Sequence, residues 1–503
     1  MRYSFFIGFI VLLMSCNNKQ IQQDNTKIVE GEDGELLDSI LTPYIKNLRK
    51  LTHNTAGLAI GVTKGERIIY ARTFGYANIE QGEKADFNSV FHIASLSKPF
   101  TAVAIAKLIE QGQLDLNDKI ITYIPEFQMK GDGYDSITIK HILTHTSGIP
   151  TNISTEDWTK PSYGAHALDE NLEAVKNHSL EFDPGTKFNY SNSAFDILGI
   201  VISRVSGMSF SDYVSTHILQ PAGMMNSTYS KPKDSLPPNF CNSYSYALQT
   251  QRWTPYPYNE KLYPSSGMLT TLPDMCRWAQ IHLGKGKFQN YKVFNEENFE
   301  LLVHPHFNTP WGNKIGLSWY LQSYLERPII MHTGQDTGFE SIIYIYPEND
   351  ISIVVMANRD FSRTGRLINA ASEVLFKEEL KPYRISAKYK FTEAYNAYGI
   401  EKAKEIWNFA KKDTTDIYEV NDDDILTTGA ILENRKKWNE TKEILDFYNT
   451  LNTSSTYSWR LLGNANLNLG DTLTAKSCYQ KCLDINPEYE KAKIALSNLI
   501  KSK

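Results

Sequence analysis

Ser95 and Lys98 stand three positions apart at the start of an apolar helical pattern that runs to Gln111. Residues three apart on a helix share a face, so the lysine amine would lie beside the serine hydroxyl. A serine hydroxyl becomes a nucleophile when a neighbouring base takes its proton, and burial can lower the pKa of a lysine enough for this role. The helix N-terminus would add its backbone N–H groups and the positive end of its dipole. The spacing therefore predicts nucleophilic catalysis by Ser95 with help from Lys98.

Two further short motifs carry groups that such a nucleophile needs. Residues 190–192 read Tyr-Ser-Asn, in which the Tyr190 phenol could act as a general acid or base. The Asn192 amide could orient Lys98 and hold a substrate carbonyl or amide. Residues 332–334 read His-Thr-Gly and lie between two predicted strands. An edge strand at this place could pair with an extended substrate, and its N–H groups could complete an oxyanion hole.

Two of these motifs have a second copy in the chain, so context decides between the copies. Ser230 and Lys233 have the spacing of the first motif, but they lie in a proline-rich stretch that no helix follows. Tyr76 and Asn78 have the spacing of the second, but they follow a hairpin, and we interpret them as structural. A Ser–His–Asp triad is the alternative chemistry, with His145 as a candidate base. No serine lies in a Gly-x-Ser-x-Gly elbow, so we expect His145 to brace a loop instead.

The three motifs, in this order, resemble those of the class C β-lactamase family in its broad sense, which includes D,D-peptidases, D-aminopeptidases and esterases. Residues 142–149 (Ile-Leu-Thr-His-Thr-Ser-Gly-Ile) and 264–269 (Pro-Ser-Ser-Gly-Met-Leu) are similar to further motifs of that family. The run His-Thr-Gly-Gln-Asp-Thr-Gly-Phe at 332–339 has the form found in many members that are not lactamases. The resemblance covers residues 36–380.

This resemblance implies a covalent acyl-enzyme. Ser95 would be the acylated nucleophile, Lys98 its base partner and Tyr190 the proton shuttle. The backbone N–H groups of Ser95 and Gln335 would form the oxyanion hole, worth about 3 kcal/mol for a single donor. The residues that the resemblance implies for substrate binding are Asn192, His332, Thr333, Gly334 and Gln335. No metal or other cofactor is expected.

His332 departs from the pattern of the true β-lactamases in this family, which usually carry a lysine there. A permanent positive charge at this position favours a substrate carboxylate. A histidine with an ordinary pKa of about 6.5 is mostly neutral at pH 7. We therefore expect a peptidase or esterase rather than an efficient β-lactamase.

The elements around these motifs predict an α+β fold. A helix is expected over residues 35–51, a hairpin around Lys64 and Gly65, and a mostly helical region with long loops from about 113 to 325. Strands at 329–331, 341–346 and 351–356 and a helix at 366–376 follow. We therefore predict an antiparallel sheet flanked by N- and C-terminal helices plus a mostly helical domain, of the β-lactamase/transpeptidase type.

The N-terminus has the form of a secretory signal. An apolar run from Phe5 to Met14 is too short to cross a bilayer, which takes roughly 20 residues, and suits a signal peptide. Ser15 followed by Cys16 resembles the lipobox of bacterial lipoproteins, in which Cys16 would be lipidated; an ordinary signal peptide with an incidental cysteine is the alternative. We expect a lipoprotein signal peptide at 1–16, a tether at 17–35, and a lipid-anchored protein of the bacterial cell envelope.

Residues 385–503 change in character and predict an all-α helical-repeat domain. Six residues fall at tetratricopeptide positions, and Gly429 precedes Gly463 by 34 residues, the period of that repeat. A generic helical bundle is the alternative, and either could bind a protein partner. The remaining cysteines match no zinc pattern, and we expect Cys478 and Cys482 to be core residues. The six tetratricopeptide-like residues are Trp459, Leu462, Gly463, Ala475, Tyr479 and Pro487.

The function expected from the sequence is that of a serine hydrolase acting on an amide or ester, such as a D-amino-acid peptide, a β-lactam-like compound or an ester. The alternative is an inactive hydrolase-like domain whose repeat tail serves as a binding scaffold in the envelope. The formal net charge of -5 and scattered basic residues give no electrostatic reason to bind nucleic acid.

Overall fold

The structure is a computed structural model that describes residues 25–153, 161–164, 166–229, 237, 239–254, 258–414 and 417–501. The predicted signal peptide with Cys16 lies outside the described residues, as do the first part of the predicted tether and the second Ser-x-x-Lys copy at 230–233. Regular structure is present before residue 36. Strand β1 (Lys27–Val29) pairs with β3, and helix α1 starts at Gly31, four residues before its predicted start.

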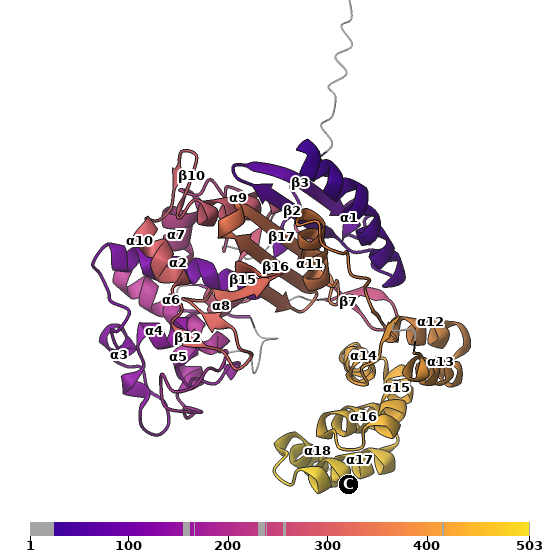
Figure 1. The fold of residues 1–503 in the computed structure, drawn as a ribbon. Coiled ribbons are helices and arrows are strands. Elements are labelled where there is room, and N and C mark those ends of the chain that lie inside the picture. The colour runs from indigo at the N-terminus through magenta and orange to yellow at the C-terminus, as the bar shows by residue number, and fades with distance from the viewer. Residues whose placement is uncertain are drawn as a thin grey trace, which may run out of the picture.

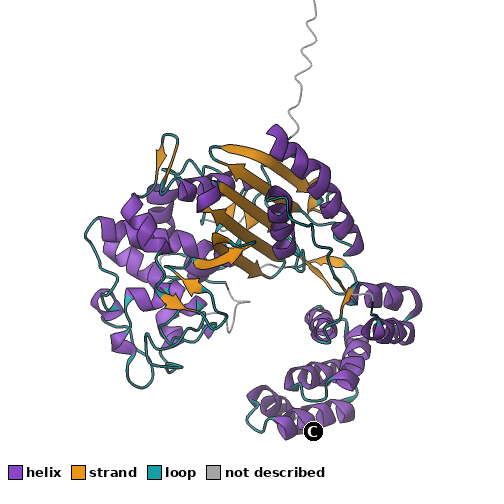
Figure 2. Ribbon diagram, viewed as in Figure 1, coloured by secondary structure: helices purple, strands orange, loops and turns teal. Residues whose placement is uncertain are grey.

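A nine-stranded antiparallel sheet forms the centre of the N-terminal part, in the order β1-β3-β2-β17-β16-β15-β14-β13-β12 (Figures 1 and 2). The predicted hairpin and the three late strands are confirmed as members of this sheet. Its strands after β1 are β2 (Leu58–Lys64), β3 (Arg67–Phe74), β12 (Phe307–Asn308), β13 (Lys314–Ile315), β14 (Tyr320–Tyr324), β15 (Arg327–Asp336), β16 (Phe339–Tyr346) and β17 (Ile351–Ala357).

Helices cover both faces of the sheet. Helices α1 (Gly31–Leu51) and α11 (Thr364–Leu375) lie on one face, where their apolar residues share a buried cluster with β2, β16 and β17. Helix α9 (Leu272–Leu283) lies on the other face, next to the helical region (Figure 1). This arrangement confirms the predicted α+β class with flanking helices.

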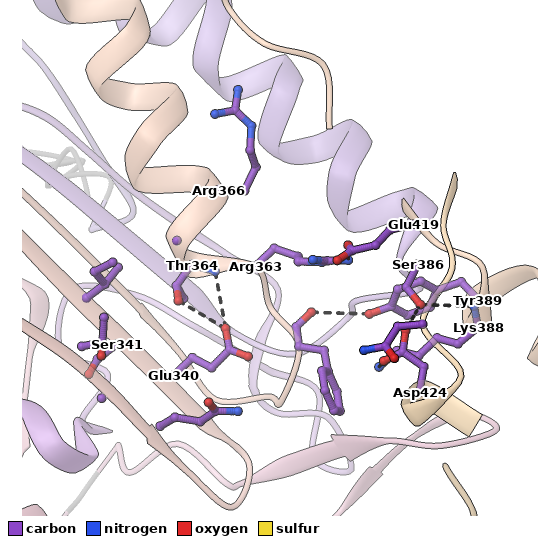
Figure 3. A pocket seen from close by; sticks show the side chains of 17 residues that line it. Glu340, Ser341, Arg363, Thr364, Arg366, Ser386, Lys388, Tyr389, Glu419 and Asp424 are labelled. Atoms are coloured by element: carbon purple, nitrogen blue, oxygen red, sulfur yellow. Dashed lines mark hydrogen bonds and ion pairs between the residues drawn. The ribbon is translucent and has the colours of Figure 1, made fainter. Parts of the chain in front are cut away.

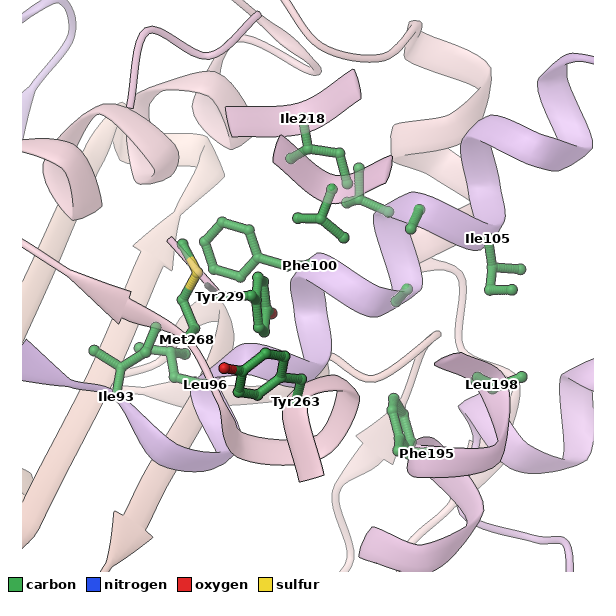
Figure 4. Close-up of a cluster of buried hydrophobic side chains, with 14 of the residues drawn as sticks. Ile93, Leu96, Phe100, Ile105, Phe195, Leu198, Ile218, Tyr229, Tyr263 and Met268 are labelled. Atoms are coloured by element: carbon green, nitrogen blue, oxygen red, sulfur yellow. The ribbon is translucent and has the colours of Figure 1, made fainter. Parts of the chain in front are cut away.

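Helix α2 (Lys98–Glu110) is the central element of the helical region. Its side chains are buried on nearly all sides, as expected for a helix that is apolar all round (Figure 4). Phe100 stacks on Trp278 of α9 at 4.0 Å between ring centroids, which ties the helical region to the sheet. The other helices of this region are α3 (Ile120–Tyr123), α4 (Ile139–Leu143), α5 (Glu170–Val175), α6 (Asn192–Ser206), α7 (Phe210–Val214), α8 (Tyr263–Ser266) and α10 (Glu296–Val303).

No single helix in the described part of the chain is long and apolar enough to cross a membrane. One bent pair, α6 together with residues Phe210–Leu219, has the length and the apolar composition of a membrane span, but the two helices meet at a bend of 76°. The residues of α6 from Ser193 to Ile202 are buried inside the helical region.

The tail is mostly helical, but it is not all-α as predicted, because β18 (Ile385–Ser386) and β19 (Tyr418–Glu419) pair in parallel at its start. One close approach between paired helices recurs 34 residues later: a Cβ at Gly429 would lie 2.4 Å from Leu445, and one at Gly463 would lie 2.5 Å from Tyr479. The 34-residue recurrence has the period of the predicted tetratricopeptide repeat, whose assignment to the tail stays a prediction. The helices are α12 (Lys388–Tyr398), α13 (Ile400–Lys412), α14 (Asp423–Asn434), α15 (Trp438–Leu451), α16 (Thr456–Asn468), α17 (Thr472–Ile485) and α18 (Glu490–Lys501).

The tail is packed onto the N-terminal part through buried contacts. The hairpin of β7 (Tyr244–Tyr246) and β8 (Thr250–Arg252) shares an apolar cluster with α12 to α15. The buried guanidinium of Arg359 donates to the carbonyl of Thr52 and to the Tyr389 hydroxyl of α12 at 3.3 Å. The boundary near residue 385 therefore separates two parts of the sequence, but the apolar cluster between the β7–β8 hairpin and the tail crosses it.

Candidate active site

Ser95 and Lys98 lie side by side at the entrance to α2. A short 3-10 turn (Ala94–Ser97) leads into the helix, and Ala94 just before the serine has a left-handed φ of 49°. Such a conformation costs a non-glycine residue of order 1–3 kcal/mol and marks a sharp change in chain direction. Lys98 Nζ lies 3.1 Å from Ser95 Oγ. The lysine is fully buried, while the serine is partly exposed.

The environment of Lys98 favours the neutral amine. Burial lowers the pKa of Lys98 to about 7, against the opposing effect of the carboxylates of Asp196 and Asp336. Its Nζ also contacts Asn192 Oδ1 at 2.6 Å and the carbonyl of Ser265 at 2.8 Å. These two acceptors hold the amine in place beside the serine hydroxyl. At neutral pH a substantial fraction of Lys98 can accept a proton.

Tyr190 faces the same amine. Lys98 Nζ lies 4.7 Å from the centroid of its ring. Burial raises the pKa of Tyr190 well above its usual value, and a hydrogen bond with Ser95 opposes this only in part. The phenol therefore keeps its proton at neutral pH. A protonated phenol at this place can donate a proton but is not available to accept one.

His145 supports the loop that carries Tyr190. The two rings are 4.3 Å apart, and the backbone N–H of Ser191 donates to His145 Nδ1 at 3.2 Å. The carbonyl of His145 accepts from the N–H of Asn189 at 2.8 Å. Burial holds the pKa of His145 well below its usual range, so the ring is neutral. Its Nε2 has no partner among the described residues, and no triad with a carboxylate is formed there.

Asn192 begins helix α6, with Ser191 as its N-cap residue. The Asn192 amide is held at both ends: Oδ1 accepts from Lys98, and Nδ2 donates to Asn152 Oδ1 at 2.8 Å. This second contact fixes which end of the amide faces the lysine. Asn152 and the Ser265 carbonyl were not among the residues predicted from the sequence.

Strand β15 passes directly beside the segment that leads to Ser95. A Cβ at Gly334 would lie 2.0 Å from the carbonyl oxygen of Ile93, so only glycine permits this approach. The hydroxyl of Ser341 in β16 donates to the same carbonyl at 2.7 Å. Gln335 follows Gly334 immediately, which brings its backbone to the neighbourhood of Ser95.

One edge of β15 is open along its second half. Strand β14 pairs with β15 from Arg327 to Met331, and no strand of the described chain pairs with residues 332–336 on that side. Asp336 and Phe339 close a two-residue hairpin, and the pair next to a closing pair turns its N–H and C=O groups outward. Gln335, which is opposite Glu340, therefore presents its N–H group to the open edge.

Residues 37–375 match the family model described as Beta-lactamase. The chain belongs to the Beta-lactamase family. Related to this Beta-lactamase-family chain is Protein flp of Staphylococcus aureus (strain MW2), 28% identical over 319 residues, which are 62% of this chain and 61% of that protein. Another relative is Penicillin-binding protein 4* of Bacillus subtilis (strain 168), 28% identical over 353 residues, with 66% and 74% covered. The chain thus spans about 61% of the length of Protein flp.

Two solved structures share the fold of this Beta-lactamase-family chain. An octameric penicillin-binding protein homologue from Pyrococcus abyssi matches with a TM-score of 0.59 at 22% identity, over 71% of this chain and 80% of that one. A penicillin binding protein from Bacillus halodurans matches with a TM-score of 0.54 at 25% identity, over 66% and 98%. The predicted β-lactamase/transpeptidase-like fold is confirmed.

His332 occupies the position at which true β-lactamases of the resemblance usually carry lysine, but its side chain is 1% exposed. Its Nδ1 and the carbonyl of Thr333 are 2.7 Å apart, which places the ring proton on Nδ1. Burial lowers the pKa of His332 to about 3. In this Beta-lactamase-family site the residue is therefore neutral throughout the physiological range and offers no positive charge.

Side chains alternate along β15, and this separates the residues predicted to bind substrate. His332 and Gly334 face the helical region, whereas Thr333 and Gln335 are exposed on the face that carries α11. The structure therefore brings Ser95, Lys98, Tyr190 and Asn192 together as side chains. It brings Gln335 to the site through its backbone.

Proposed function

We propose that this protein is a serine hydrolase that forms a covalent acyl-enzyme on Ser95. One observation carries the proposal: a buried amine whose pKa is lowered to about 7 lies 3.1 Å from a partly exposed serine hydroxyl. A serine becomes reactive when such a base is within hydrogen-bond reach. The membership of the chain in the Beta-lactamase family supports this assignment.

In the first chemical step, Ser95 Oγ attacks the carbonyl carbon of an ester or amide while its proton passes to neutral Lys98 Nζ. The carbonyl oxygen gains the negative charge of the tetrahedral intermediate. The N–H groups of Ser95 and Gln335 stabilise this oxyanion in our proposal, and one such donor is worth about 3–4 kcal/mol. The position of Gln335 at the open edge of β15 supports its part.

In the second step the intermediate collapses, and the bond between the carbonyl carbon and the leaving oxygen or nitrogen breaks. The leaving atom takes a proton through the Tyr190 phenol, which is replenished from the Lys98 ammonium 4.7 Å from its ring. Water then attacks the acyl carbon of the Ser95 ester and gives up a proton to Lys98 Nζ. The bond between this carbon and Ser95 Oγ breaks, Oγ takes that proton from Lys98, and the carboxylic acid product leaves. Ser95 and Lys98 return to their starting protonation states.

We propose esters or amides, including D-amino-acid peptides, as substrates in preference to β-lactams. The neutral state of buried His332 supports substrates that place no carboxylate next to this ring, which are esters, amides and D-amino-acid peptides whose carboxylate lies elsewhere. A carboxylate at this position, as in a β-lactam, would find no positive charge on His332. A panel of p-nitrophenyl esters, nitrocefin and D-amino-acid peptides tests the choice. Turnover of nitrocefin that exceeds that of every ester and peptide would contradict it.

Labelling with a fluorescent fluorophosphonate or a fluorescent penicillin tests the nucleophile. We expect a covalent adduct on the wild type and none on Ser95→Ala. Ser230→Ala is a matched control, because Ser230 opens the other Ser-x-x-Lys copy, and it should label as the wild type does. Absence of labelling of the wild type by both reagents, combined with no turnover in the panel, would favour the inactive scaffold instead.

We also propose that Cys16 is lipidated and anchors the protein in the bacterial cell envelope, and that the repeat tail binds a protein partner there. The position of Cys16 directly after an apolar run supports the anchor. Metabolic labelling with a fatty acid should mark the wild type but not Cys16→Ala. Equal labelling of both would contradict the anchor. A pull-down with residues 385–503 as bait, from membrane extracts, tests the tail.

A further inference from the structure

A cavity of 470 Å³ lies where the hydrolase part meets the tail (Figure 3). The ends of β15 and β16 and the first turn of α11 form one wall, and tail residues between 386 and 424 form the other. Its volume falls within the range of about 300–1,000 Å³ that small-molecule sites occupy. Ser95, Lys98 and Tyr190 do not line it, so this junction cavity is distinct from the candidate active site.

The charged groups of the junction cavity balance one another. Arg363 pairs with Glu419 at 2.6 Å, and Arg366 is bound by Glu373 at 2.6 Å outside the cavity. A simple anion would meet the repulsion of the carboxylates, and a simple cation that of the basic groups. The basic residues are Arg363, Arg366 and Lys388, and the acidic ones are Glu340, Glu419 and Asp424.

Glu340 is already committed to the helix next to it. Its carboxylate accepts from the backbone N–H groups of Ser362 at 3.2 Å and Thr364 at 3.4 Å, and from the Thr364 hydroxyl at 3.2 Å. It therefore satisfies the N-terminus of α11 from within the chain. The N-terminus of α11 is therefore not available to bind an anionic group of a ligand in the cavity.

The ammonium of Lys388 is buried but has no hydrogen-bond acceptor among the described residues. Its residue is 2% exposed, and its Nζ lies 3.2 Å from the centroid of the Phe361 ring. Asp424 is 3.8 Å away, which is close enough for an ion pair but too far for a hydrogen bond. Within the part of the chain that the structure describes, this ammonium donates no hydrogen bond, although it has three N–H donors. A buried donor of this kind gains from a ligand acceptor.

We propose that the junction cavity binds a small zwitterion, an amino acid or dipeptide, with its carboxylate on Lys388 and its ammonium near Glu419 and Asp424. Each end of such a ligand meets a charge of opposite sign, and its net charge of zero matches the balanced wall. The mixed charges favour it over a ligand of a single sign.

The junction cavity shares Gly334 and Gln335 with the strand beside Ser95. A ligand held against these residues would restrict the part of β15 that supplies the proposed oxyanion donor. We therefore expect occupancy to change the rate of Ser95 acylation. This second effect rests on the proposed function, whereas binding itself does not.

Calorimetric titration of the full chain with three matched probes tests the proposal: glycylglycine, N-acetylglycylglycine with only the carboxylate, and glycylglycinamide with only the ammonium. We expect glycylglycine to bind at least tenfold more tightly than either of the others. Binding should persist after fluorophosphonate labelling. Equal affinity for the three probes, no binding of any of them at millimolar concentration, or loss of binding on labelling would overturn the proposal.

Two variants locate the ligand. Lys388→Met should weaken glycylglycine binding at least tenfold, whereas Lys390→Met, at an exposed lysine of the same helix, should leave it unchanged. Glu419→Gln, at a half-exposed side chain, should weaken glycylglycine but strengthen N-acetylglycylglycine. This opposite response requires a charge contact and would not arise from a loss of folding. Equal weakening by Lys388→Met and Lys390→Met, or a Glu419→Gln effect of one sign on both probes, would place the ligand elsewhere.

Discussion

Lys98 is surrounded by groups that pull its pKa in opposite directions. Burial lowers the pKa to about 7, while the carboxylates of Asp196 and Asp336 raise it. Asp196 is itself buried and accepts from the N–H of Ser265 at 3.1 Å, and the carbonyl of Ser265 accepts from Lys98. The carboxylate thus acts on the lysine both through its charge and through this loop.

The rate of Ser95 acylation should depend on pH in a way that follows from this balance. In the proposed mechanism the base is the neutral amine, so the rate should rise with pH and reach half of its limit near pH 7. Asp196→Asn removes a charge that raises the lysine pKa, so the midpoint should move to lower pH. Labelling rates measured from pH 5 to 9 check both expectations. A midpoint that moves upward in the variant would contradict this account.

Tyr190→Phe should lower turnover by about 10²–10⁴-fold, because it removes the proton relay to the leaving group. The ring would keep its contact with His145 at 4.3 Å, so thermal stability should change little. Steady-state kinetics with an ester and an amide measure the effect. The amide should lose more activity than a p-nitrophenyl ester. An amine leaving group must be protonated before it departs, whereas the phenolate of the ester can leave without a proton. An equal loss for both substrates would argue against a relay role.

Strand β15 can lie directly against the turn before Ser95 because Gly334 has no side chain. Gly334→Ala would place a methyl group 2.0 Å from the Ile93 carbonyl and force the strand away from the nucleophile. Overpacking of this kind costs about 1–3 kcal/mol, and the displacement of Gln335 should also reduce turnover by at least about tenfold. Thermal unfolding and ester turnover measure the two effects.

Gly365→Ala provides the control for this prediction. A Cβ at Gly365, in the first turn of α11, meets no atom within 4 Å. Stability and turnover of this variant should therefore remain close to those of the wild type. If Gly334→Ala behaved in the same way, the close approach would not be what positions the strand.

At the scale of elements, regular patterns in the sequence were sufficient to predict the helix after Ser95, the hairpin and the late strands. Their own residues mark them, as the continuous apolar run marks α2 and as the spacing of Leu37 and Leu41 marks α1. The N-terminal end was less well predicted, because β1 depends on pairing with β3, and Gly34 in the first turn of α1 packs against the Ile69 backbone of the same distant strand. Contacts of this type leave no local signal.

The same limit applies to the site. The spacing of Ser95 and Lys98 predicts their contact, because both belong to one turn of the chain. Asn152 and the Ser265 carbonyl belong to loops whose course depends on the whole helical region, so their contacts could not be predicted from spacing. The neutral state of His332 was expected, but its burial depends on the packing of Tyr320 at 5.6 Å between rings.

For the whole molecule, the tail and the N-terminal part are joined by buried polar contacts, and we expect these contacts to stabilise both. Tyr389 accepts from the guanidinium of Arg359, which is fully buried between the two parts. Tyr389→Phe removes this acceptor, and a hydrogen bond to a charged group contributes about 1.5–3 kcal/mol. We expect a lower midpoint of thermal unfolding, together with loss of Ser95 labelling at a lower temperature.

Tyr398→Phe is the matched control, since this tyrosine ends the same helix α12 and is 78% exposed. It should unfold at the temperature of the wild type. If Tyr389→Phe shifted only the unfolding of the tail and left the temperature dependence of labelling unchanged, the two parts would be energetically independent.

Within the described chain, the second half of β15 pairs with β16 only, and its free edge restricts the shape of a molecule that pairs with it beside Ser95. A ligand that forms main-chain hydrogen bonds with this edge must be extended, because the amides of a helical backbone are already hydrogen-bonded within the helix. A compact folded protein could not pair with this free strand edge, whereas an unfolded peptide terminus or a short linear molecule could. Selectivity of this kind arises before any side chain is recognised.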